Sequence, residues 1–158
     1  MSYILIMIAI IFGEQKIKDY MEEKKELGKS EEILGGNIIL QKYHNSGMFL
    51  NFLEEKKEMV LTVSKVFVGI ILLLFAITLP RKGNKVFKLG LAMTLGGAIS
   101  NVMDREKRGY VVDYFSFSKL KKVVFNLSDM FIILGSFLIA VASIFSTKGK
   151  RCANEPFE

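Results

Sequence analysis

The chain has 158 residues, of which 51% are hydrophobic and 24% are charged, and its formal net charge is +6. Such a composition requires apolar and charged residues to be segregated along the chain. The single cysteine, Cys152, and the single histidine, His44, exclude an internal disulfide framework, a Cys/His zinc cluster and a multi-histidine metal site. Because the basic residues lie between long apolar runs, they indicate a membrane surface rather than a nucleic acid as the partner. We therefore expect one integral membrane domain over residues 1–158.

Four apolar stretches are predicted to cross the membrane, which requires about 20 mostly apolar residues for a core roughly 30 Å thick. They are residues 3–18, 59–79, 86–103 and 126–145. The purely apolar part of the first stretch, Tyr3 to Phe12, is too short alone, so this span must also carry Glu14 and Lys18. Four spans place both termini on one side of the membrane, and the loops of residues 19–58 and 105–122 on the other. The basic residues on the two sides do not decide which side is cytoplasmic.

Each of these two loops contains a stretch that predicts β-structure. Residues 19–32 are charged and typical of a helix, but residues 38–43 follow the turn residues 35–37 and are typical of a strand. Residues 110–115 form a second apolar, strand-like stretch. The predicted fold is therefore an all-α membrane protein with four transmembrane helices and a small β-sheet outside the membrane.

Ionisable residues in or beside membrane spans are costly, so they are functional candidates. Lys65 lies near one end of its span, where its ammonium group can reach the surface. Asp104 is followed by Arg105-Glu106-Lys107-Arg108, which predicts a local ion pair or a helix-end role close to solvent. Asp113 and Asp129 differ because each lies in an apolar run, and the predicted topology puts both at the same face of the membrane.

Two carboxyl groups that meet in a low-dielectric site cannot both ionise easily, so one keeps a proton while the other can accept one from water. This is the arrangement of an aspartyl hydrolase. The spacing of Asp113 and Asp129 leaves an alternative open, in which both are structural hydrogen-bond acceptors at the N-terminus of the fourth helix.

Three sequence motifs follow one another in the second half of the chain. They are Leu95-Gly-Gly-Ala-Ile-Ser-Asn-Val-Met-Asp-Arg105, Gly109-Tyr-Val-Val-Asp113-Tyr-Phe and Phe125-Asn-Leu-Ser-Asp129. This ordered set resembles the signature of the lipoprotein signal peptidases (signal peptidase II), which reads Gly-Gly-Ala-x-Gly-Asn-x-x-Asp-Arg, Val-Val-Asp-Phe and Phe-Asn-x-Ala-Asp. His44-Asn45-Ser46-Gly47 is similar to the Asn-x-Gly loop motif of that family, and Glu14-Gln15-Lys16-Ile17-Lys18 to its Asp-Gln-x-x-Lys motif.

The chain departs from the family pattern at several positions. Glu14 stands where the family has Asp, Ser100 where it has Gly, and Ser128 where it has Ala. Met48-Phe49-Leu50 replaces the Ala-Ala-aromatic triplet that follows the loop motif. The carboxylates that carry the resemblance are retained, so we expect an active, divergent member, with a paralogue of altered substrate range as the alternative.

The resemblance implies a membrane aspartyl endopeptidase that removes the signal peptide of a prolipoprotein by cleaving before a diacylglyceryl-modified cysteine. It implies Asp113 and Asp129 as the catalytic pair, one activating water as general base and the other protonating the leaving amine. Positions implied to bind substrate or support the pair are Asn45 and Gly47 on a covering loop, Asn101, Asp104, Arg105 and Asn126 near the pair, and Glu14 and Lys18 on the first helix. No metal or cofactor is implied.

The resemblance also implies a location and an orientation. The protein would lie in the bacterial cell (inner) membrane as a monomer, with the active site and both loops outside and both termini in the cytoplasm. Its partners would be lipid-modified prolipoproteins and membrane lipids, with no nucleic acid.

Two other functions remain open from the residues alone. One is a small transporter or channel that uses Glu14, Asp113 and Asp129 as a proton or cation path, although the chain lacks inverted repeats and paired broken helices. The other is a non-enzymatic membrane adaptor with a basic surface. Release of the signal peptide from a lipid-modified substrate in detergent distinguishes the peptidase from both.

Overall fold

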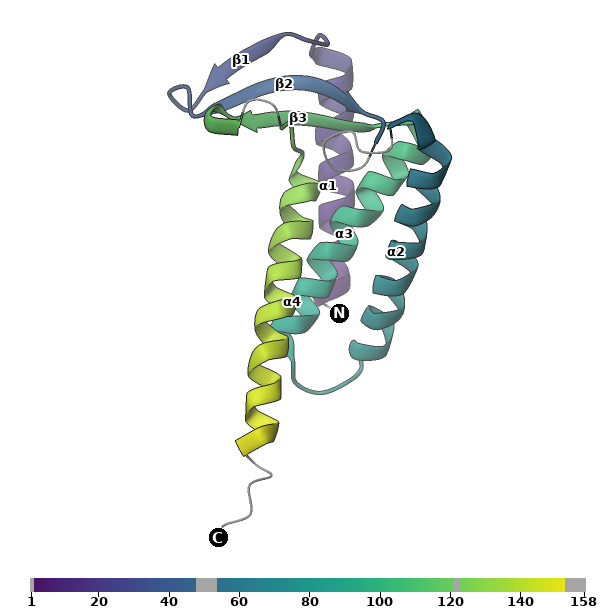
Figure 1. Ribbon diagram of the computed structural model, residues 1–158, viewed down its shortest axis with the longest axis vertical. Coiled ribbons are helices and arrows are strands. Elements are labelled where there is room, and N and C mark those ends of the chain that lie inside the picture. The colour runs from purple at the N-terminus through teal and green to yellow at the C-terminus, as the bar shows by residue number, and fades with distance from the viewer. Residues whose placement is uncertain (1, 48–53, 121–122, 153–158) are drawn as a thin grey trace.

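The computed structural model describes residues 2–47, 54–120 and 123–152, and within them it contains four α-helices and a three-stranded sheet (Figure 1). The helices are α1 (Ser2–Lys24), α2 (Lys57–Thr78), α3 (Lys85–Arg108) and α4 (Leu127–Cys152), and the strands are β1 (Ser30–Ile33), β2 (Ile38–Asn45) and β3 (Val111–Phe117). Two short 3-10 helices, η2 (Glu54–Lys56) and η3 (Ser118–Leu120), precede α2 and follow β3. The predicted combination of four helices and a small sheet is confirmed.

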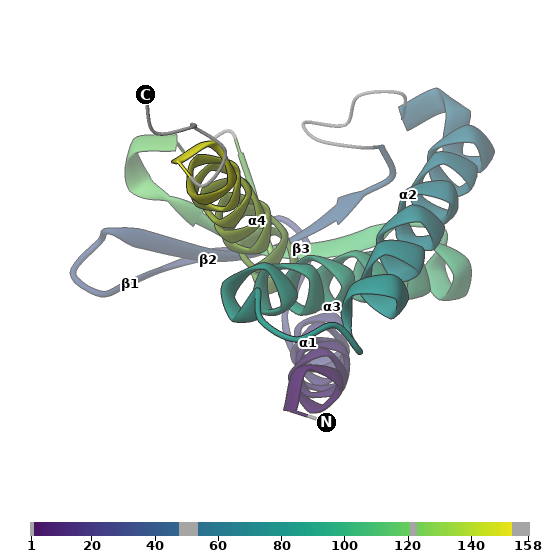
Figure 2. The same ribbon diagram turned by 90° about the horizontal axis from the view of Figure 1, so that it is seen from below.

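Helix α3 forms the centre of the helical bundle. Seen along the bundle, α1 lies on one side of α3, and α2 and α4 lie on the other (Figure 2). Small residues allow α4 to approach α3 closely, because a Cβ atom on Gly97 would lie 2.4 Å from the carbonyl oxygen of Ser128 and one on Gly90 would lie 2.7 Å from that of Gly135. The small residues of α3 therefore set the position of the first turns of α4.

Helices α2 and α4 turn most of their apolar side chains outward. Three helical segments, Glu54–Thr78, Lys85–Arg108 and Leu127–Phe145, are long and apolar enough to cross a membrane, and their most apolar windows are 17%, 67% and 11% buried. The exposed apolar surface of the outer two is what lipid contact requires. Helix α1 carries more charge but runs beside the other helices (Figure 1), so its role as a fourth span stays a prediction.

The antiparallel sheet lies across one end of the bundle, in the order β1-β2-β3 (Figure 1). The β1–β2 hairpin turns through residues 34–36, all of which have positive φ. Strand β2 then pairs with β3, so that Tyr43 lies opposite Asp113. Val112 and Tyr114 of β3 pack with Met21 of α1 in a small apolar core that fixes the sheet on the helices.

Two predicted boundaries are wrong. Residues 19–32 were expected to be helical, but α1 ends at Lys24 and β1 begins at Ser30, because β2 supplies the backbone partners of this short charged strand. Residues from Arg105 onward were assigned to a loop, but α3 continues to Arg108. It ends there because Gly109, with a φ of 81°, adopts the left-handed conformation of a helix C-cap.

The close contact between α3 and α4 gives a test of the fold. We expect Gly97→Ala to lower the free energy of unfolding by about 1–3 kcal/mol, because the new methyl group meets the α4 backbone rather than a flexible side chain. Gly69→Ala in α2 is the matched control, since nothing lies within 4 Å of its Cβ position. Thermal unfolding in detergent measures both; equal melting temperatures for the two variants would contradict this account.

Candidate active site

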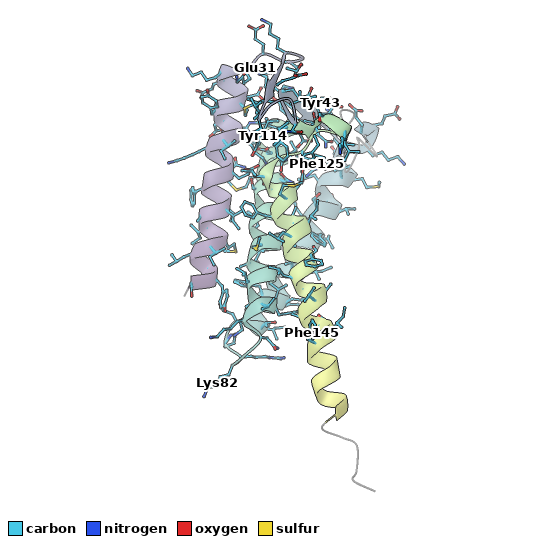
Figure 3. All side chains as sticks on the ribbon, turned by 90° about the vertical axis from the view of Figure 1, so that its left-hand side faces the viewer. Glu31, Tyr43, Lys82, Tyr114, Phe125 and Phe145 are labelled. Carbon is cyan, nitrogen blue, oxygen red and sulfur yellow. The ribbon has the colours of Figure 1, made fainter. Side chains whose placement is uncertain are left out.

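The predicted site residues come from five elements, α1, β2, α3, β3 and α4, that meet where the sheet contacts the helices. Asp113 lies on β3, Asn45 ends β2, and Asn101 lies on α3. Asn126 and Asp129 lie at the start of α4. In Figure 3, the labelled residues Tyr114 and Phe125 mark this end of the molecule, and Lys82 lies at the opposite end.

Asp113 is only 1% exposed and has both carboxyl oxygens hydrogen-bonded. Asn45 Nδ2 donates to Oδ2 at 3.0 Å, and Asn126 Nδ2 donates to Oδ1 at 2.6 Å. Burial, and after it the negative charge of Asp129, raises the pKa of Asp113 to about 7, although the two amide hydrogen bonds lower it. This carboxyl group can therefore carry a proton near neutral pH.

Asp129 forms a reciprocal cap with Asn126 at the N-terminus of α4. The backbone N–H of Asp129 donates to Asn126 Oδ1 at 3.0 Å, and the backbone N–H of Asn126 donates to Asp129 Oδ2 at 3.2 Å. The structural alternative raised from the sequence is thus part of the arrangement. The side-chain amide of Asn126 also donates to Asp113, so one residue binds both carboxyl groups, Asp113 through its side chain and Asp129 through its backbone N–H.

Lys18, which lies inside the bundle, sets the orientation of the Asn101 amide group. Its side chain is fully buried, and its Nζ lies 2.7 Å from Asn101 Oδ1, 3.3 Å from Ser100 Oγ and 3.1 Å from Asp104 Oδ2. Because Asn101 Oδ1 accepts from Lys18, its amide nitrogen must point the other way, and it donates to Asp129 Oδ1 at 3.0 Å. A buried cation on α1 thereby orients a donor toward the α4 carboxylate.

The predicted local ion pair of Asp104 is confirmed, because Asp104 pairs with Arg108 of the charged run that follows it. Since α3 continues to Arg108, that residue lies one turn beyond Asp104 on the same face. The predicted exposure of Asp104 is wrong, because Asp104 is fully buried and also pairs with Lys18 of α1. Asp104 Oδ2, the oxygen that Lys18 contacts, also accepts from the backbone N–H of Val112 at 3.2 Å, which joins α3 to β3.

Arg105 instead reaches the end of β2. Its Nη2 donates to the carbonyl oxygen of Gly47 at 2.8 Å, and Gly47 in turn donates its N–H to Asn45 Oδ1 at 3.1 Å. Its Nε has no hydrogen-bond partner among the residues that the structure describes. The Met48-Phe49-Leu50 segment of the expected covering loop lies outside the described residues.

Glu14 lies behind the start of α4. It is 2% exposed, and its carboxylate accepts from the backbone N–H of Ser128 at 3.2 Å and from the hydroxyl of Tyr114 at 3.0 Å. Sequence reasoning missed Tyr114, although its position beside Asp113 and a hydroxyl in an otherwise apolar strand were available signals. Lys65 does not join the site, since it pairs with Glu106 on the surface at 2.7 Å.

The arrangement offers acid-base chemistry. Among the described residues, no group of three His, Cys, Asp or Glu side chains could hold a metal ion. Two linked carboxyl groups, one of them deeply buried, match the pattern in which one carboxyl keeps a proton while the other acts as a base.

Known proteins resemble this chain in sequence and in fold. A family model described as signal peptidase (SPase) II matches residues 6–145. The chain is 28% identical over 151 residues to a lipoprotein signal peptidase of Fusobacterium nucleatum, covering 96% of this chain and 91% of that protein. It is 33% identical over 138 residues to one of Brevibacillus brevis, covering 85% and 89%. A bacterial membrane enzyme solved by the in meso method at 2.3 Å resolution shares the fold, with a TM-score of 0.82, 22% identity and coverage of 99% of this chain and 94% of that one.

Proposed function

Because this chain belongs to the signal peptidase II family, it is a multi-pass membrane peptidase of bacteria that removes signal peptides from prolipoproteins, and we propose that Asp113 and Asp129 are its catalytic pair. The observation that carries this proposal is Asn126, whose side-chain amide donates to Asp113 Oδ1 and whose backbone N–H donates to Asp129 Oδ2 in a largely buried site. The bond cleaved would be the one before the lipid-modified cysteine.

The pair supplies a base and an acid for peptide hydrolysis. Asp129, which is the less buried of the two, takes a proton from a water molecule that attacks the carbonyl carbon of the scissile bond. Asp113, whose pKa is raised to about 7, holds the proton that passes to the leaving amine. The reaction consumes one water and leaves one proton on the pair, now on Asp129, and this proton must pass to Asp113 before the next turnover.

The surrounding side chains hold the pair. Asn45, Asn101 and Asn126 keep the carboxyl oxygens in place through their amide nitrogens. Arg105 holds the carbonyl oxygen of Gly47, and its positive charge lies near Asp113 and Asp129. Behind these groups, the Lys18–Asp104 ion pair joins α1 to α3, and Glu14 joins α1 to α4.

A proton or cation path is a weaker account of the same residues. The carboxylate oxygens of Glu14 are occupied by Ser128 and Tyr114, and those of Asp113 by two asparagines. An ion path requires carboxylates that exchange partners with water or the ion, which these fixed hydrogen bonds oppose.

Substitution of the carboxyl groups tests the catalytic pair. We expect Asp113→Asn and Asp129→Asn each to lower the rate of signal-peptide release by about 10³-fold or more, with near-normal protein yield. The double variant should lose little more, because the two groups act as a unit. Asp104→Asn is the control, since it breaks a buried ion pair and should reduce accumulation more than the rate per folded molecule. A fully active, folded Asp113→Asn enzyme would remove Asp113 from the pair.

The pH dependence tests which carboxyl group carries the proton. If Asp113 is the acid, kcat/KM falls as pH rises through its pKa, which lies at about 7. Asn45→Ala removes a hydrogen bond that lowers this pKa, so the alkaline limb of the profile should move up by about one pH unit. Gln41→Ala on the same strand is the control, because Gln41 binds Ser116 instead. If the alkaline limb of the profile moves to lower pH instead, the assignment of Asp113 as the acid is wrong.

Labelling of cysteines tests the proposed orientation. The start of α1 and the end of α4 lie opposite the sheet (Figure 1), so an outward-facing site puts both termini in the cytoplasm. In a Cys152→Ser background, we expect Lys29→Cys to react with a membrane-impermeant thiol reagent on intact cells. Lys82→Cys, at the opposite end, should react only after the cells are opened. The reverse pattern would overturn the orientation.

A further inference from the structure

The N-terminus of α4 is capped by side chains from three parts of the chain. A helix leaves its first N–H groups without partners inside the helix. Here the N–H of Leu127 donates to Tyr114 Oη at 3.1 Å, that of Ser128 to Glu14 Oε1 at 3.2 Å and that of Asp129 to Asn126 Oδ1 at 3.0 Å. The first turn of α4 is thus held by β3 and α1 as well as by its own cap residue.

Tyr114 and Glu14 act as one unit within this cap. The Tyr114 hydroxyl accepts from Leu127 and donates to Glu14 Oε2 at 3.0 Å, so its single hydrogen is committed to the carboxylate. Both side chains are buried, at 5% and 2% exposure. Burial raises the pKa of Tyr114, so the hydroxyl stays protonated over the range in which the enzyme works.

The carboxylate of Glu14 on α1 and the hydroxyl of Tyr114 on β3 meet at 3.0 Å. Each residue thus provides the partner that the other needs in a buried site.

We propose that the Tyr114 hydroxyl, together with Glu14, is a positioning group that sets the distance between the catalytic carboxyl groups. This inference rests on the proposed roles of Asp113 and Asp129. Tyr114 follows Asp113 on β3, and its hydroxyl holds the first turn of α4, which carries Asp129. One strand therefore bears one carboxyl group and fixes the other. A misplacement of catalytic groups by about 1 Å can cost roughly a hundredfold in rate, so such a link affects turnover directly.

The test is the removal of the hydroxyl oxygen. We expect Tyr114→Phe to lower kcat by about tenfold or more while KM for a lipid-modified prolipoprotein changes less than about twofold. Tyr110→Phe is the matched control. The Tyr110 hydroxyl also donates to a glutamate of α1, Glu22, at 3.3 Å, but it lies away from α4. Its loss should leave kcat unchanged.

A second variant tests the carboxylate side of the unit. Glu14→Asp keeps the charge but shortens the side chain, so it should also lower kcat, and it provides a test even where Tyr114→Phe accumulates poorly. Because both changes act on one link, the double variant should be no slower than the slower single variant. If the losses in kcat of the two single variants multiply in the double variant, the two residues act independently, and the proposal that they form one unit is wrong.

The remaining outcomes separate this inference from the proposed function. Unchanged kcat in Tyr114→Phe, with Asp129→Asn inactive, overturns the positioning role and leaves the catalytic pair in place. An equal fall in kcat for the Tyr110 and Tyr114 variants also overturns it, because the loss would then be a general effect of weakening contacts to α1. Activity retained in Asp129→Asn would instead refute the catalytic pair itself.

Discussion

The buried ammonium group of Lys18 ties together the helices that hold the carboxyl groups. It reaches from α1 to Ser100, Asn101 and Asp104 of α3, and Asp104 continues the connection to Val112 of β3. A buried charge without its partner costs about 3–5 kcal/mol, so α1, α3 and the sheet must assemble together for the charge to be tolerated. The orientation of Asn101 follows from this assembly, and with it the donor that faces Asp129.

Asp129 combines two tasks that usually fall to different residues. As part of the α4 cap, it accepts a hydrogen bond from the backbone of Asn126, and as a proposed base it must accept a proton from water. The cap fixes one oxygen, and Asn101 fixes the other. A base held in this way loses little freedom when substrate binds, because its position is set before the reaction begins. Asn126, the cap residue, also restrains Asp113, because its side-chain amide donates to Asp113 Oδ1.

Much of this arrangement could be predicted from the sequence because its signals are local. The apolar runs predict α2 and α4, and the apolar stretch around Asp113 predicts both β3 and the raised pKa of its carboxyl group. Three features depend on distant partners and could not be read in the same way. The charged strand β1 exists because β2 pairs with it, Asp104 is buried because Lys18 comes from another helix, and the role of the Tyr114 hydroxyl requires Glu14.

The position of the proposed site at one end of the bundle suits a reaction that needs water but acts on a substrate held in the membrane. Hydrolysis needs water, whereas the acyl chains of a lipid-modified cysteine are stable only in the bilayer. The carboxyl groups lie where the helices meet the sheet, and the apolar sides of α2 and α4 extend from that level toward the other end of the bundle (Figure 1). A substrate placed against these helices can keep its acyl chains in lipid while its peptide bond reaches the level of Asp113 and Asp129. Within the part of the chain that the structure describes, this end of the bundle therefore suits both requirements of the proposed reaction.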